Sequence, residues 1–329
     1  MPFSHILAQA TAVGTLTRAL QSGRVHHAYR FEGPDGVGKE LAAFALAQAL
    51  VCEANDPLGC GVCSACKRAV TLSEDEPRGP IHPDVKLVER GLYPADVIGR
   101  KSKEVSEISV DQIRSIVLSH ASYPPHEGKA RVYIFRRAEE LNTSAANALL
   151  KILEEPRQGT HFILLSSRGD RLLNTIKSRT LPIRFAPLPD EVVRNILVSR
   201  GIKGRVDLAI ELAAGSASAA LELADEERSA ARDEFVSRVL AAADARDLGP
   251  AVDLAETADR DKGELYRDLR ALAAALARSA RGSVQEAPEK AATAARRYEA
   301  VARAATRLER NASPMLTLVS LITELRDAR

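Results

Sequence analysis

The sequence predicts an α/β fold with a mainly parallel sheet, followed by an all-helical region. Two observations carry this prediction. Short apolar runs typical of buried strands alternate with helical patterns as far as Pro187. From Pro189 onwards the chain is rich in Ala, Arg and Leu and shows no strand pattern. The sheet is therefore expected to belong to the first part of the chain alone.

Composition limits the classes of protein that the chain can represent. Its 329 residues suffice for two or three domains, since domains cluster near about 100–150 residues. The net charge of only +2 creates no global basic field, so any DNA contact is expected to be local or shared with partners. Met1–His5 lacks the features of a signal peptide, and no apolar run approaches the roughly 18 residues of a membrane span. The sequence predicts a cytoplasmic protein without a membrane contact.

A Gly-rich loop follows the predicted strand Ala28–Phe31 and precedes a helical pattern over Leu41–Leu50. This order of strand, loop and helix is typical of a phosphate-binding P-loop. In such a loop, backbone N–H groups surround phosphate oxygens, the helix N-terminus adds positive potential, and a lysine reaches the outer phosphates. The candidate nucleotide-binding residues are Gly33, Gly36, Gly38 and Lys39.

The loop departs from the P-loop pattern at Glu40, where Ser or Thr would offer a hydroxyl to Mg²⁺. A carboxylate adds negative charge beside a polyphosphate and is a poor replacement. Alternatively, Glu40 is simply an acid in the first turn of a helix, where the helix dipole favours it. The loop keeps the shape of a nucleotide site but lacks one catalytic part.

All four cysteines of the chain fall within fifteen residues. Two overlapping C-x-x-C steps and one upstream cysteine make a complete tetrahedral set for a structural zinc ion, with no open position for a catalytic water. Cytosolic thiols stay reduced, which disfavours disulfides. The alternative is four unliganded cysteines. The predicted ligands are Cys52, Cys60, Cys63 and Cys66.

The remaining elements follow from hydrophobic periodicity and from helix stop signals. Four further apolar runs are expected to be strands: Val85–Val88, Ala130–Phe135, Phe162–Leu165 and Leu181–Phe185. Four further helices are expected: Gln9–Ser22, a helix starting at Ile108–Asp111 and running to about Ser119, Asn142–Glu155, and Arg171–Lys177. Gly91–Glu107 is polar and irregular and is expected to be an exposed loop.

The helical remainder is expected to form two parts. Pro189–Asp225 predicts a small helical unit, and about a hundred residues beyond it predict a helical domain. Ala-rich stretches such as Ala271–Ala277 allow close helix packing, as in a bundle or an oligomeric collar. The predicted domains are residues 1–187 with the cysteine module at 52–66, residues 188–226, and residues 227–329.

Several stretches together resemble one family, the clamp-loader subunits of bacterial DNA polymerase III. The resemblance covers nearly all of residues 1–187. Beyond them it rests on the layout of the later domains and on Asn311–Pro314. Besides the inserted cysteine module, the stretches that carry it are His27–Tyr29, His82–Asp84, Ile108–Arg114, Ala145–Pro156 and Ser178–Thr180. The resemblance implies an AAA+ P-loop core, a small helical lid and an all-α collar, in a five-membered ring that loads the sliding clamp onto primed DNA. The implied partners are tau/gamma motor subunits and the delta subunit, with the clamp and DNA reached through the complex.

Motor subunits of this family hydrolyse ATP, and the resemblance implies that this chain does not. In motors the strand before the helix ends in Asp-Glu, which hold magnesium and position the attacking water, whereas here it ends in Arg136 and Arg137. The lid arginine of a motor matches Ser218. With Glu40, three catalytic parts are missing, so no catalysis by the chain itself is expected. Any polymerase activity would belong to the holoenzyme.

One functional part of the family remains. Ser178-Arg179-Thr180 matches the family's Ser-Arg-Cys motif, whose arginine reaches into the ATP site of the neighbouring subunit. Thr180 replaces the usual Cys and leaves the arginine in place. The implied site residues are thus Arg179, acting in trans, and Ser178. The alternative is a surface arginine paired with a carboxylate.

Two other functions compete with that of a ring-completing subunit. An ATP-hydrolysing motor subunit is opposed most directly by Arg136 and Arg137. A regulator that binds ATP without hydrolysing it is left open, because the loop glycines and Lys39 are intact. The sequence therefore leaves open whether ATP and Mg²⁺ bind to this chain.

Overall fold

The computed structural model describes residues 3–99, 107–127, 129–202, 204, 206–245, 247, 249–256, 262–309 and 312–328. Residues 100–106 of the predicted loop and Asn311 lie outside them. The chain divides into two compact units: Met1–Arg200 with Ala213–Ala219, and Gly201–Leu212 with Ala220–Arg329. No helix within the described residues is long and apolar enough to cross a membrane.

The first unit is built on a five-stranded sheet in which every neighbouring pair is parallel. The strand order is β2-β3-β4-β1-β5. Phe31 on β1 is paired with Leu165 on one side and with Ile183 on the other, which places β1 between β4 and β5. The strands are β1 (Ala28–Glu32), β2 (Val85–Val88), β3 (Arg131–Phe135), β4 (Thr160–Ser166) and β5 (Leu181–Arg184). The parallel sheet predicted from the apolar runs is confirmed.

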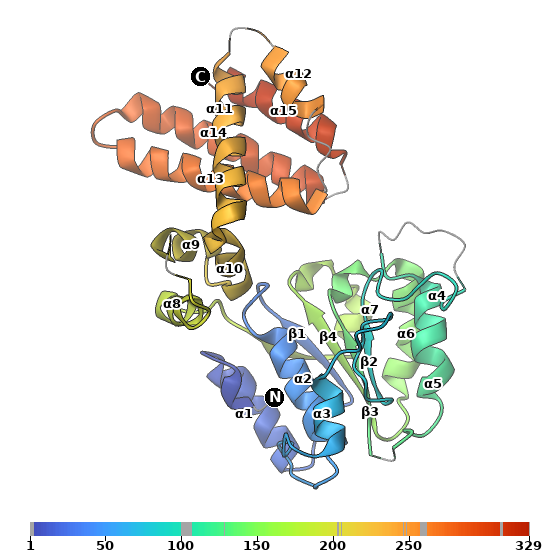
Figure 1. The fold of residues 1–329 in the computed structure, drawn as a ribbon. Helices are drawn as coiled ribbons and strands as arrows, with labels where there is room; N and C mark the ends of the chain where they lie inside the picture. The colour runs from blue at the N-terminus through green and yellow to red at the C-terminus, as the bar shows by residue number, and fades with distance from the viewer. Residues whose placement is uncertain are drawn as a thin grey trace. The chain divides into compact units, whose positions relative to one another are not determined.

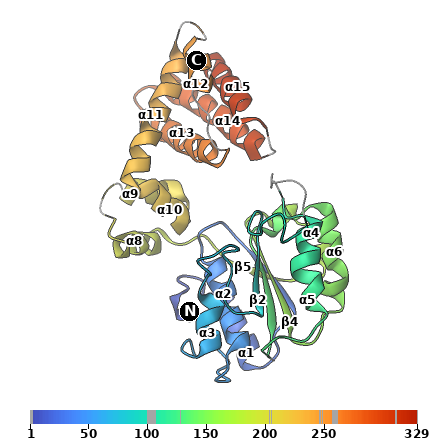
Figure 2. The ribbon, with the colours of Figure 1, turned by 45° about the vertical axis from the view of Figure 1, so that its right-hand side comes forward.

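Helices cover both faces of this sheet (Figure 1; Figure 2). On one side lie α1 (Ala10–Gln21), α2 (Lys39–Val51) and α3 (Ser64–Val70), and α2 contacts β3 and β4. On the other side lie α4 (Val110–Gln112), α5 (Ser119–Ala121) and α6 (Thr143–Glu154). Tyr133 and Phe135 of β3 pack into the cluster that includes Leu149 of α6. Successive strand residues point to opposite faces, so a strand buried on both sides reads as a continuous apolar run.

Two helix predictions differ from the structure. The predicted helix to about Ser119 is a π-helix over Ile113–Leu118 in its middle, with α4 and α5 as its ends. The buried Tyr133 donates a hydrogen bond of 3.3 Å to the carbonyl of Val117 in these widened turns. The predicted helix Arg171–Lys177 is reduced to a 3₁₀ turn (Gly169–Arg171) and the short α7 (Asn174–Lys177), because Leu172 extends to reach the core.

The all-helical remainder is confirmed for the described residues. It consists of α8 (Asp190–Ser199), α9 (Val206–Ala213), α10 (Ala217–Ala224), α11 (Glu226–Asp244), α12 (Gly249–Glu256), α13 (Lys262–Ser283), α14 (Pro288–Glu309) and α15 (Pro314–Asp327). Apolar side chains from α11 to α15 form one core, in which Leu269, Val301 and Leu321 are fully buried.

Candidate functional site

The Gly-rich loop joins β1 to α2 at the carboxyl edge of the sheet, in the geometry that a P-loop requires. Gly36 has φ +72° and Gly38, the residue before α2, has φ +102°, both in the region that favours glycine. A Cβ on Gly36 would lie 2.3 Å from the hydroxyl oxygen of Ser218. The backbone N–H of Ala217 also donates to the carbonyl of Gly36 at 3.1 Å. The loop is therefore packed tightly against the turn that carries Ser218.

Lys39 is turned back onto its own loop. Its ammonium donates to the carbonyls of Gly33 and Pro34 at 2.5 Å each and lies 3.7 Å from the carboxylate of Asp35. Burial lowers the pKa of Lys39, while the carboxylates of Asp35 and Glu139 act in the opposite direction. The cation that would meet outer phosphates in a P-loop is thus held by the loop itself.

Arg136 joins the end of β3 to the start of α2. Its guanidinium forms an ion pair with Glu40 through Nη2 and lies 2.7 Å from the Glu89 carboxylate through Nη1. Burial opposes the charge of Arg136, but hydrogen bonds and attraction from the two carboxylates hold its pKa above the usual value. Glu40, which departs from the P-loop pattern, and Arg136, which stands where motor subunits have an acid, are 96 residues apart but opposite in charge and in contact.

Sequence reasoning missed Glu139, which follows the strand end by four residues. Its Oε1 accepts hydrogen bonds from the backbone N–H and hydroxyl of Ser167, at 3.1 and 2.9 Å. Its Oε2 is buried and has no hydrogen-bond partner among the described residues. Arg137, just before it, has φ +48°, an uncommon conformation for a non-glycine residue. The available sequence signal was an acidic residue shortly after a buried strand.

The candidate arginine Arg179 follows α7 and contacts α6. Its Nε donates to the carboxylate of Glu154 at 2.7 Å, and its Nη2 pairs with the same oxygen. Its Nη1 donates to the carbonyl of Thr175 at 2.9 Å and to the hydroxyl of Ser178 at 3.1 Å. Ser178 and Arg179 are thus brought together, and the carboxylate partner belongs to the helix before β4.

A buried arginine on the P-loop strand, which sequence reasoning also missed, holds this segment in place. Arg30 is 8% exposed. Its Nη1 donates to the hydroxyl of Thr180 at 2.9 Å and to the carbonyl of Lys177 at 3.1 Å. Its Nε pairs with the Glu32 carboxylate at 2.6 Å. The Thr180 hydroxyl therefore has its own role: it accepts from Arg30 and donates to the carbonyl of Ile176.

The four cysteine thiols converge on one point. All four sulfur atoms lie within 4.8 Å of one another, and those of Cys60 and Cys66 are 3.9 Å apart. Zn–S bonds of about 2.3 Å in a tetrahedron give S–S separations of about 3.8 Å, so the thiols could hold one metal ion. Cys52 ends α2, Cys66 lies in α3, and the turn between them supplies the other two ligands. Sequence reasoning had not foreseen α3.

Backbone N–H groups prepare these thiols for metal binding. The N–H groups of Cys63 and Cys66 point to the sulfur atoms of Cys60 and Cys63 at 3.4 Å. Burial acts to raise the pKa of Cys63, but the hydrogen bonds to it outweigh burial and lower that pKa to about 6. Burial raises the pKa of Cys66. Bound zinc would hold all four as thiolates.

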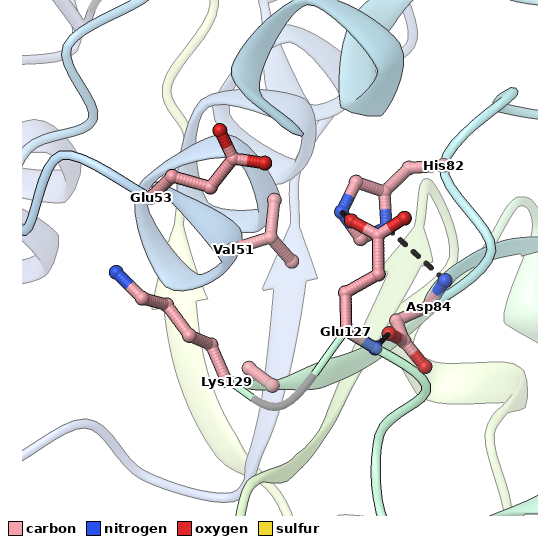
Figure 3. Close-up of a pocket in the computed structure, with 7 residues that line it drawn as sticks. Val51, Glu53, His82, Asp84, Glu127 and Lys129 are labelled. Carbon is pink, nitrogen blue, oxygen red and sulfur yellow. Dashed lines mark hydrogen bonds and ion pairs between the residues drawn. The ribbon is translucent and has the colours of Figure 1, made fainter. Parts of the chain in front are cut away.

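A polar junction with a cavity of about 30 Å³ ties the cysteine module to the sheet (Figure 3). Asp84 is fully buried and accepts the backbone N–H groups of residues 126 and 127. Its own N–H donates to Nδ1 of His82, so the ring proton lies on Nε2. That atom is 3.2 Å from the Glu127 carboxylate, without the geometry of a hydrogen bond.

Two contacts link this junction to the cysteine module. Arg68 of α3 pairs with Glu127 at 2.6 Å, and Lys129 donates to the carbonyl of Cys52. We interpret this cluster as structural, because both carboxylates are bound by arginines: Glu127 by Arg68 and Asp84 by Arg131 at 3.1 Å.

Comparison with known proteins identifies the family. The sequence model described as "DNA polymerase III, delta subunit" matches residues 8–189. This chain belongs to that family. The DNA polymerase III subunit gamma/tau of Mycobacterium tuberculosis is 34% identical over 197 residues, which are 59% of this chain and 30% of the relative. The DNA polymerase III subunit delta' of Bacillus subtilis is 29% identical over 194 residues, 59% of this chain and 52% of the relative. The chain spans about a third to a half of the length of these relatives.

One solved structure supports the fold of this DNA polymerase III delta-family member. A gamma subunit-related protein of Thermotoga maritima aligns over 96% of this chain and 99% of its own, with a TM-score of 0.50 and 17% identity. At that identity the likeness concerns the fold alone. The predicted AAA+ P-loop fold with a helical C-terminal region is confirmed, as is the predicted membership of the clamp-loader family.

Proposed function

We propose that this chain is a delta-prime subunit of a DNA polymerase III clamp loader, which hydrolyses no ATP and supplies Arg179 to a neighbouring motor subunit. The observation that carries the proposal is the ion pair between Arg136 and Glu40. In the motors that the chain resembles, the residues at these two positions bind magnesium. In this chain they form an ion pair with each other.

The pair works against catalysis in two ways. A guanidinium stays charged at all relevant pH values, so Arg136 repels a divalent cation at the place where Asp would attract one. It also binds both nearby carboxylates, Glu40 and Glu89, and cancels one of their two negative charges. Magnesium would have to displace a cation that two carboxylates hold at once. With no metal and no Asp-Glu pair, the attacking water has neither electrostatic nor positional support.

The other parts of the chain also have roles in this proposed function. Residues 188–226 act as the lid and residues 227–329 as the collar through which the subunit joins the ring. The partners are tau/gamma motor subunits and the delta subunit, with the sliding clamp and primed DNA reached through the complex in the cytoplasm. The cysteine cluster holds one structural zinc ion. Its thiol spacing and its N–H groups support this assignment.

A second function, nucleotide binding without hydrolysis, is supported by the loop itself. Gly36 and Gly38 keep the left-handed conformations that orient backbone N–H groups towards phosphate. Against it, Lys39 is bound to the carbonyls of Gly33 and Pro34 and would have to leave them.

The purified chain is expected to hydrolyse ATP no faster than its Lys39→Ala variant, because neither protein has a magnesium site. The measurement is phosphate release by each protein with ATP and Mg²⁺. A tau/gamma subunit and its own P-loop Lys→Ala variant form the positive control. Turnover by the wild-type chain that disappears in Lys39→Ala would refute the assignment as a non-hydrolysing subunit.

A further inference from the structure

In this chain the side chain of Arg179 is almost fully engaged by its own subunit. A guanidinium has five N–H donors. Arg179 uses one from Nε, two from Nη1 and one from Nη2, which makes four hydrogen bonds. Two of these reach a single oxygen, Oε1 of Glu154. One N–H of Nη2 is left.

The donors that Glu154 occupies are those that a phosphate needs. Nε and Nη2 form a side-on fork that matches two oxygens of a carboxylate or phosphate. In the observed conformation Oε1 of Glu154 closes this fork. A neighbouring subunit's nucleotide could form bidentate hydrogen bonds with Arg179 only after Glu154 releases it. A carboxylate that stayed beside the phosphates would also repel them.

We propose that Glu154 is a resting partner of Arg179, which competes with the neighbour's nucleotide for the guanidinium and is exchanged for it when the ring binds ATP. This inference rests on the proposed function. It identifies Glu154 as a positioning residue, acting through Arg179, that restrains the arginine until a triphosphate takes its place.

The exposure of the pair suits an exchangeable contact. The side chains of Arg179 and Glu154 are 29% and 48% exposed. Partly exposed ion pairs are weak, so a triphosphate with several charged oxygens can outcompete one carboxylate. In contrast, Arg30 is buried and binds the segment through the carbonyl of Lys177 and the side-chain hydroxyl of Thr180. The segment is therefore fixed while the tip of Arg179 is released.

The contact can be tested on the full chain alone by NMR of the arginine Nε–H groups. The Arg179 signal is assigned by its absence in Arg179→Ala. In Glu154→Gln we expect its exchange with water to accelerate about two- to fivefold, in keeping with the strength of a surface ion pair. The matched control is Glu155→Gln, which removes the same charge one residue further on and should leave the exchange rate unchanged. Equal rates in Glu154→Gln and wild type would overturn the proposed contact.

The competition is tested in rings where the motor site facing this chain alone is competent. For Glu154→Gln, we expect kcat/KM for ATP at that site to rise about two- to fivefold, with Glu155→Gln unchanged. A fall in kcat/KM would overturn the inference, because Glu154 would then be helping Arg179 rather than competing for it. An unchanged value would overturn it as well. Arg179→Ala in the same rings separates the two claims: if it has no effect, the proposed function fails, whereas the NMR result on Glu154 still stands by itself.

Discussion

Replacing Arg179 by Ala is expected to lower ATP turnover about 10³- to 10⁵-fold at the one motor site that faces this chain. Phosphoryl transfer spreads negative charge over the equatorial oxygens, and an arginine from a neighbour stabilises that charge. Arg179→Lys should fall in between, because an ammonium keeps the charge but not the planar fork. Sites served by other subunits should continue, so total turnover falls only in part, while clamp loading should suffer more. The measurement is DNA- and clamp-stimulated ATPase together with loading in reconstituted rings.

The chain offers a control for this substitution. Arg157 is also exposed and donates to a backbone carbonyl, that of Ser122, so Arg157→Ala removes an equal charge from the same unit. It should leave both activities unchanged. Assembly of the Arg179→Ala ring is checked by its elution volume. Wild-type ATPase and loading in a fully assembled Arg179→Ala ring would reduce Arg179 to a surface residue paired with Glu154.

The Cys63→Ser variant is expected to lose the zinc ion that we assign to the cysteine cluster. A hydroxyl is a much weaker zinc ligand than a thiolate, and a closed four-ligand site does not tolerate the loss of one member. Metal analysis after purification without chelators should give about one zinc per wild-type chain and far less than one in the variant. Because α3 contains the proposed ligand Cys66 and packs against α2, loss of the metal should loosen α3, and proteolysis within residues 52–70 should accelerate in the variant.

Val62→Ser is the matched control for the zinc experiment. Val62 lies between two of the proposed ligands, and its side chain is 71% exposed. Its replacement should leave the zinc content and the proteolysis pattern unchanged. Zinc that persists in Cys63→Ser, or a wild-type chain that contains none, would exclude the assignment and leave four unliganded thiols.

The fold could be predicted from sequence wherever one local signal decided it. The run Val132–Phe135 is buried on both faces, so its continuous apolar character was sufficient to identify a central strand. The π-helical turns around Val117 could not be found in this way. They involve a hydrogen bond from Tyr133, which lies on another element, and helical periodicity carries no information about such a partner.

In the candidate site, too, local motifs could be predicted from the sequence and contacts between distant elements could not. The loop glycines and the cysteine set were identified from spacing, since each motif is continuous in the chain. The sequence also showed Glu40 as a departure from the P-loop pattern and Arg136 as a departure from the Asp-Glu pair of the motors. Their ion pair depends on the tertiary structure, because the fold brings the end of β3 to the start of α2. The partners of Arg179 on α6 and of Thr180 on β1 were hidden for the same reason.

In our proposal Arg136 has taken the place of magnesium, and a nucleotide titration of the purified chain tests this most directly. Binding of a fluorescent ATP analogue is measured with Mg²⁺ and with EDTA, and a tau/gamma motor subunit serves as the reference that requires the metal. We predict that Mg²⁺ changes the affinity of this chain by less than about twofold, whether binding is weak or strong, because the guanidinium of Arg136 already occupies the carboxylates of Glu40 and Glu89. A tightening of about tenfold or more on adding Mg²⁺, equivalent to about 1.4 kcal/mol, would contradict the claim.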